Sequence, residues 1–66
     1  MSYADRIAEL DHKHDPRHIE AYMRVKYSSL DSLSPKKFAS EVKFAGKVVD
    51  FGGLERAEET ARRFGL

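Results

Sequence analysis

The sequence predicts an all-α protein, a small compact bundle of three to four short helices. Two dipeptides mark helix starts, because Asp15-Pro16 and Ser34-Pro35 each place an N-capping side chain before a proline at the first helical position. Gly52-Gly53 indicates a helix end, since glycine tolerates the left-handed backbone that is common there. No alternating run of β-branched residues and no Asn-Gly or Asp-Gly turn predicts a strand.

The first helix is expected from Tyr3 to Asp11, behind a Ser2 cap. Tyr3, Ile7 and Leu10 lie at spacings of four and three, which places them on one stripe. A helix this short is marginal in isolation, so it must dock on the rest of the chain to persist.

The second helix is expected from Pro16 to about Ser28. Its inward face is predicted to hold Ile19, Tyr22 and Met23. Its outward face is predicted to hold Arg17, Glu20 and Arg24. In the polar link that follows, Leu30 and Leu33 are expected to fill the core between the second and third helices.

The fourth helix is expected from about Leu54 to Phe64. Its inward residues are predicted to be Leu54, Ala57, Ala61 and Phe64. With these four helices, residues 1–66 are expected to form a single helical domain around one small core.

The third helix, expected from Pro35 to Phe51, has three distinct faces. At about 100° per residue, the core face consists of Phe38, Val42, Ala45 and Val49. The opposite face carries Lys36, Lys43 and Lys47, together with Ser40 and Asp50. Between these two lies a second apolar stripe of Phe44, Val48 and Phe51. About half of the girth is therefore apolar and needs cover on two sides.

Two interpretations of the second stripe remain open. A neighbouring helix of the same domain could cover it, as happens for many central helices. Alternatively, Phe44, Val48 and Phe51 bind a protein partner or a second copy of the chain, with Lys43 and Lys47 at the rim. A chain of 66 residues gains stability by associating, so our first functional hypothesis is a small protein-protein interaction module.

The alternative functional hypothesis is a nucleic-acid-associated protein. Lys36, Lys43 and Lys47, with Arg24 or Lys26, would contact phosphates in this case. A net charge of only +1 is far from the basic excess of a dedicated nucleic-acid-binding protein. The chain also has no Asn or Gln with which to read adenine edges.

Gly46 lies inside the third helix, where it costs about 1 kcal/mol relative to alanine. We predict that it permits a close crossing of the third and fourth helices, with Ala39 beside it and Ala57 and Ala61 opposite.

The histidines His12, His14 and His18 cluster beside Asp11 and Asp15. Imidazole and carboxylate groups can bind zinc or nickel, but Pro16 interrupts the spacing and Asp15 is expected to cap the second helix. We therefore expect a polar turn that gains charge below about pH 6.5, with no metal and no cofactor.

No nucleophile elbow, phosphate-cradling glycine loop or HExxH motif occurs, so we expect no enzyme activity. The absence of cysteine fits a reducing compartment. No apolar run approaches the roughly 20 residues of a membrane span, and the first residues lack signal-peptide features. We expect a cytoplasmic protein that does not enter the membrane.

The stretch HIEAYMRVKYSSLDSLSPKKFASEV, with its HxEAYMR and LDxLS arrangements, and the terminal FGL resemble short bacterial open reading frames, some carried on phages or other mobile elements. The resemblance covers about residues 15–66. It implies no activity and no functional residues. A mobile-element origin would suit an accessory protein that modulates a larger host or phage complex.

Overall fold

Each predicted helix forms where its capping residues indicate. The computed structural model describes residues 2–66, which form α1 (Tyr3–Leu10), α2 (Pro16–Lys26), α3 (Pro35–Gly52) and α4 (Leu54–Arg63). A short 3₁₀ turn, η1 (Leu30–Ser32), lies between α2 and α3. The all-α prediction is confirmed, and no strand occurs in the described part of the chain.

The N-caps form the hydrogen bonds that the sequence predicts. The Asp15 carboxylate accepts a bond of 2.9 Å from the backbone N–H of Arg17, and the Ser34 hydroxyl accepts one of 3.2 Å from that of Lys37. Gly53 separates α3 from α4 with a φ of 83°, a conformation that glycine adopts without strain. The N-terminal caps and this glycine therefore set the register of α2, α3 and α4.

Three helix ends fall slightly earlier than predicted, and one of them is that of α4, which ends at Arg63 rather than at Phe64. α1 ends at Leu10, because the Asp11 side chain accepts bonds from the backbone N–H groups of Lys13 and His14, at 2.8 and 3.2 Å. Such a local turn competes with continuation of the helix. α2 ends at Lys26 rather than near Ser28.

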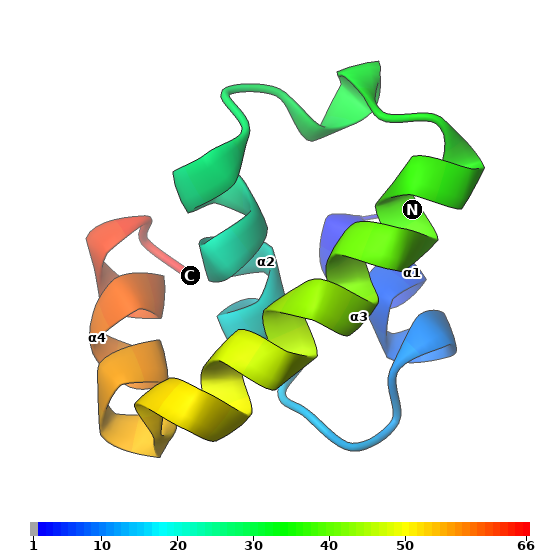
Figure 1. Cartoon of the computed structure of the whole chain (residues 1–66). Coiled ribbons are helices and arrows are strands. Elements are labelled where there is room, and N and C mark those ends of the chain that lie inside the picture. The colour runs from blue at the N-terminus through cyan, green and yellow to red at the C-terminus, as the bar shows by residue number, and fades with distance from the viewer. Residues whose placement is uncertain (1) are drawn as a thin grey trace.

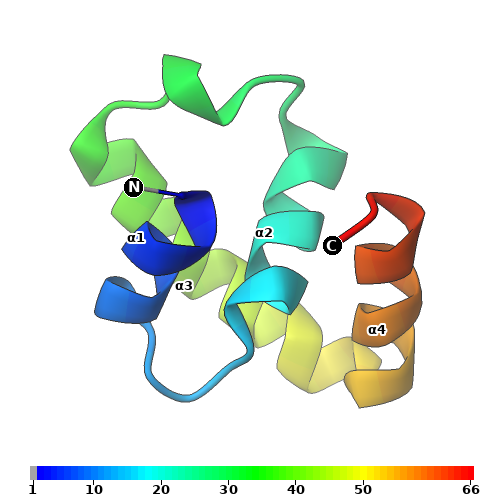
Figure 2. The ribbon, with the colours of Figure 1, turned by 180° about the vertical axis from the view of Figure 1, so that it is seen from behind.

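α2 is the central helix of the fold. It packs against α1, α3 and α4. Figure 1 shows α3 crossing in front of α2, and Figure 2 shows α1 and α4 on either side of α2. This arrangement covers the side of α3 that faces α2.

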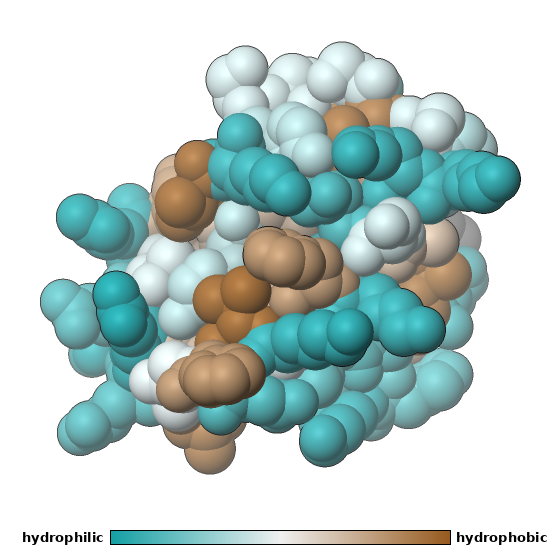
Figure 3. All heavy atoms as spheres, in the orientation of Figure 1, coloured by the Kyte–Doolittle hydropathy of each residue, from teal (hydrophilic) through white to brown (hydrophobic). Residues whose placement is uncertain are grey.

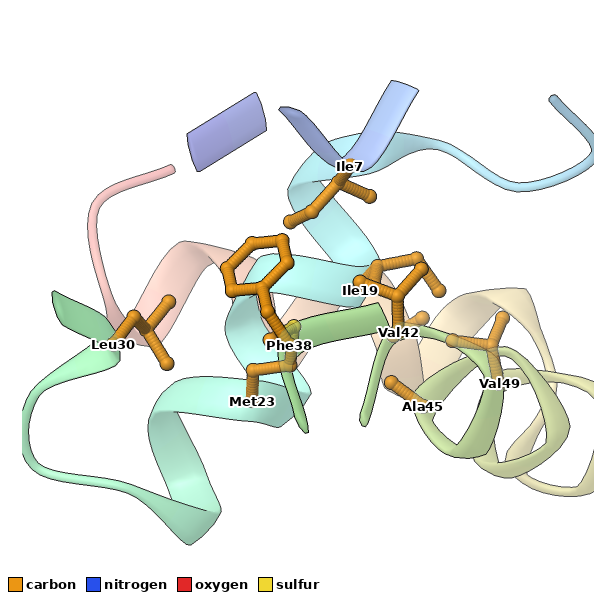
Figure 4. Close-up of a cluster of buried hydrophobic side chains, with 9 residues drawn as sticks. Ile7, Ile19, Met23, Leu30, Phe38, Val42, Ala45 and Val49 are labelled. Atoms are coloured by element: carbon orange, nitrogen blue, oxygen red, sulfur yellow. The ribbon is translucent and has the colours of Figure 1, made fainter. Parts of the chain in front are cut away.

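The core forms around Phe38, which is 1% exposed and points from α3 toward Ile7 of α1 (Figure 4). The predicted core face of α3 is confirmed, since Phe38, Val42, Ala45 and Val49 are all buried. The remaining core residues are Ile7, Ile19, Met23, Leu30 and Ala57. Tyr22 and Leu33 are partly buried and pack against this cluster, as expected.

Four predictions of which way a side chain faces are wrong. Leu10, expected on the docking stripe of α1 with Tyr3 and Ile7, is 51% exposed. Leu54 is 70% exposed and Phe64 is 37% exposed, because α4 docks through the small residues Ala57, Thr60 and Ala61 instead. Glu20, predicted to face solvent, is buried, and its carboxylate lies 2.7 Å from the Arg24 guanidinium one turn later. This ion pair compensates part of the cost of burying the charge.

We predict that Phe38→Ala lowers the free energy of unfolding by about 3–5 kcal/mol, because it opens a cavity at the centre of the core. The matched change Phe44→Ala should lower it by about 1 kcal/mol or less, since that ring is 54% exposed. Urea unfolding followed by circular dichroism measures both. Equal losses in the two variants would contradict this description of the core.

Candidate protein-binding surface

The second apolar stripe of α3 is left uncovered by the chain. Phe51 is 95% exposed and Phe44 54% exposed, while Val48 between them is half-buried. We call these three residues the apolar patch. Figure 3 shows apolar surface gathered along α3 in the front view, bordered by hydrophilic side chains. The helix wheel thus correctly separates this stripe from the core face.

Lys26 of α2 covers one side of the Phe44 ring. Its Nζ atom lies 4.8 Å from the ring centroid, a cation–π contact. The same ammonium lies 3.2 Å from the buried carboxylate of Glu41, which Lys37 also approaches at 3.9 Å. Lys26 is therefore already neutralised within the chain.

A hollow of about 310 Å³ lies beside Phe51, at the end of the patch. It is lined by Tyr22, Val48, Phe51, Gly52 and Arg56. Gly52 leaves room at this point, since a Cβ there would lie 3.4 Å from both the Tyr22 hydroxyl and Cδ of Arg56. The Tyr22 hydroxyl is buried and has no hydrogen-bond partner among the described residues.

Sequence reasoning missed the part that α4 plays in this hollow. Arg56 reaches it because the turn at Gly53 brings the start of α4 beside the end of α3. Gly52-Gly53 predicts a turn, but no local pattern predicts the angle at which α4 leaves it.

The lysines of α3 are exposed, as predicted. Lys47 lies three residues after Phe44 and four before Phe51, so it is a helical neighbour of both. Lys43 and Lys47 form no ion pair with any of residues 2–66. These two residues thus give the patch an unpaired basic border.

Arg24 does not join the α3 lysines. Its guanidinium pairs with Glu20. Arg24 lines two hollows together with residues of α1, α2, the segment around η1 and the C-terminal end of the chain, and no residue of α3 lines either hollow. The four residues of the nucleic-acid hypothesis, Lys36, Lys43, Lys47 and Arg24, therefore do not form one continuous surface.

The predicted role of Gly46 is wrong. The side of Gly46 on which a Cβ would lie faces the turn between α1 and α2, and that Cβ would be 3.1 Å from Cε1 of His14. The three atoms nearest to that Cβ belong to His14 and Asp11, and none of them to α4. Gly46 instead lets the His14 ring lie against α3, at one end of a second hollow of about 430 Å³ that Lys43 and Lys47 also line.

His14 bridges two carboxylates across this contact. Its Nδ1 lies 2.8 Å from Asp11 and its Nε2 lies 2.9 Å from Asp50 on α3. Both carboxylates are acceptors, so both ring nitrogens donate only when the imidazole is protonated. Lys13 lies 3.6 Å from the other oxygen of Asp50. The turn is polar, as expected, and it ties α1 to α3.

These contacts shift the pKa values of all three groups. The hydrogen bond to Asp50 raises the pKa of His14; burial opposes the rise and Asp11 adds to it. The bond from His14 lowers the pKa of Asp50. Burial raises the pKa of Asp11, but hydrogen bonds from Lys13 and His14 outweigh it, so the net pKa is lowered.

The histidines and carboxylates are not arranged as a metal site. Among residues 2–66, no three His, Cys, Asp or Glu side chains converge as metal ligands. His12 is exposed, and Asp15 is occupied by Arg17 at 2.8 Å. His18 is buried, with its Nε2 4.0 Å from Asp15.

None of the described helices is both long enough and apolar enough to cross a membrane. Comparison with protein-family models, with curated proteins and with solved structures gives no significant match to this chain.

We predict that Gly46→Ala fails to stabilise the protein, although the same change in an open helix gains about 1 kcal/mol. The new methyl group would displace His14, which two carboxylates hold in place. In a His14→Ala background the gain of about 1 kcal/mol should return. Chemical denaturation of the four variants measures this cycle, and equal effects of Gly46→Ala in both backgrounds would refute the contact.

We predict that the His14 bridge stabilises the fold most below about pH 6.5. Because its folded pKa is raised, the contribution is complete below the unfolded pKa and is lost as pH rises through the folded value. The Asp11 and Asp50 contributions, with lowered pKa values, are lost only as pH falls through those values. The free energy of unfolding, measured from about pH 5 to pH 9, should fall with rising pH in the wild type and fall less in His14→Gln. Identical pH profiles in the two proteins would contradict a stabilising role of the His14 bridge.

Proposed function

We propose that this protein is a small interaction module that binds another protein through the apolar patch on α3, with Lys43 and Lys47 at its rim. The single observation that carries the proposal is the 95% exposure of Phe51, beside a 54% exposed Phe44 and a partly buried Val48. Burying one such ring at an interface is worth about 1.5–3 kcal/mol. A stable fold has no need of this arrangement, so it supports a role in association.

Aromatic side chains with a basic border are typical of interface centres. The patch is also supported rigidly, because Phe44, Val48 and Phe51 alternate along α3 with the core residues Ala45 and Val49. The resemblance of residues 15–66 to mobile-element reading frames favours a larger host or phage assembly as the setting, and the proposal includes a cytoplasmic location.

Association with nucleic acid is the second candidate function. It is favoured by the exposure of Lys36, Lys43 and Lys47, which extend about 16 Å along α3. This function would appear as binding to mixed DNA and RNA that weakens steeply between about 50 and 200 mM salt. The separation of Arg24 from these lysines makes it the weaker candidate.

We predict that a photo-crosslinking phenylalanine analogue at Phe51 forms a discrete protein adduct in the cell that makes this protein. The exposed ring should lie against the partner, so Phe44→Ser in the same chain should remove the adduct. The matched control places the analogue at Glu9, an exposed position on α1. The readout is the mass of each adduct by gel electrophoresis and mass spectrometry.

The mass also separates the two kinds of partner. An adduct of two 7.6 kDa chains, with matching sedimentation of the purified protein, would identify a second copy. A heavier adduct that contains another polypeptide would identify a different protein. Identical adducts from positions 51 and 9, or none from position 51, would refute the proposed surface.

A further inference from the structure

Resting on the proposed function, we infer that the partner is a different protein, which presents an acidic amphipathic helix. This helix lies along α3 and inserts one branched apolar side chain into the hollow between Val48, Phe51 and Arg56. Carboxylates on its flanks pair with Lys47 on one side of the patch and with Arg56 on the other.

The surface shape of the patch is complementary to a helix. Phe44 and Phe51 are both more exposed than Val48, which lies between them in the sequence, and they are about 10 Å apart along the axis at 1.5 Å per residue. Val48 lines the hollow together with Phe51 and Gly52. A side chain from a facing helix can enter the hollow beside Val48 and Phe51, and residues at i, i+4 and i+7 of that helix extend over the same length as Phe44 to Phe51.

The hollow can take an apolar group with a carboxylate close by. Val48 and Phe51 supply apolar side chains to its lining, Tyr22 also lines it, and its open volume of about 310 Å³ has room for one branched side chain. Arg56 also lines the hollow, with its Cβ and Cδ near Gly52. Its guanidinium can bind a carboxylate with two parallel hydrogen bonds.

The charges around the patch favour an acidic partner. Lys43, Lys47 and Arg56 form no ion pair with any residue in the described range 2–66. Both carboxylates of α3 are already paired, Glu41 with Lys26 and Asp50 with His14. Lys43 and Lys47 are therefore free cations on the α3 side of the patch. On the α4 side Arg56 is also unpaired, as are the exposed carboxylates of Glu55 and Glu59 on the same helix.

The same charges disfavour a second copy as the occupant. A two-fold symmetric dimer through the patch would bring the free lysines and Arg56 of both chains into one interface. Like charges brought within the Debye length of about 8–10 Å repel each other, and desolvation strengthens the repulsion. An acidic helix meets no such cost.

Two synthetic helical peptides of about 16 residues test the inference. Both carry leucines at i, i+4 and i+7, and their flanking positions are all glutamate in one peptide and all lysine in the other. Each is titrated into the isotope-labelled full chain and followed by NMR. We expect the glutamate peptide to shift the amides of Val48, Phe51, Gly52 and Arg56 and to bind at least about tenfold more tightly than the lysine peptide.

Charge reversal provides the control. Lys47→Glu/Arg56→Glu should reverse the preference between the two peptides. Arg62→Glu, a matched change on α4 beside His18 and away from the patch, should leave the preference unchanged. High salt should weaken the binding of the glutamate peptide by about threefold or more.

Each outcome decides the inference. Equal binding of the two peptides at the patch would overturn the acidic partner but leave the proposed docking surface intact. Failure of both peptides to bind, or shifts confined to other residues, would overturn the acidic helix as occupant. Failure of the proposed function is seen separately, as the absence of an adduct from position 51.

Discussion

The fold is limited by how little chain is available to cover α3. This helix has 18 residues, whereas α1, α2 and α4 have only 8, 11 and 10. A domain of this size buries about 60% of the surface that its unfolded chain exposes. The helices α1, α2 and α4 all contact α3, and together they bury its inner stripe from Phe38 to Val49. No described element remains to cover Phe51, so one apolar flank stays open to solvent.

The distribution of charge also follows from how little chain is available to cover α3. In a domain this thin, carboxylates near helix contacts become buried or bridged, as Glu20, Glu41 and Asp11 are. Each holds a cation or an imidazole nearby, which compensates its lost hydration. The acidic groups of α3 are thereby occupied inside the molecule, while Lys43 and Lys47 are left free. A net charge of +1 conceals these unpaired lysines beside the apolar patch.

Much of this architecture could be predicted from the sequence, because local rules determine it. Capping residues mark where helices begin, and the 3.6-residue period separates the core face of α3 from the stripe at Phe44 and Phe51. The errors arise where tertiary packing decides. Gly46 meets His14 rather than α4, because the turn between α1 and α2 folds back onto α3. Leu54 is exposed because α4 docks through its small residues. With α4 docked in this orientation, Arg56 lies beside the patch.

The central claim is that the chain itself leaves the apolar patch open. Solvent paramagnetic relaxation, measured by NMR with a soluble gadolinium chelate on the dilute protein, tests it most directly. We expect strong relaxation of the Phe51 ring protons, intermediate relaxation for Phe44 and almost none for Phe38, in line with exposures of 95%, 54% and 1%. Protection of Phe51 equal to that of Phe38 would contradict it, because the ring would then belong to the core.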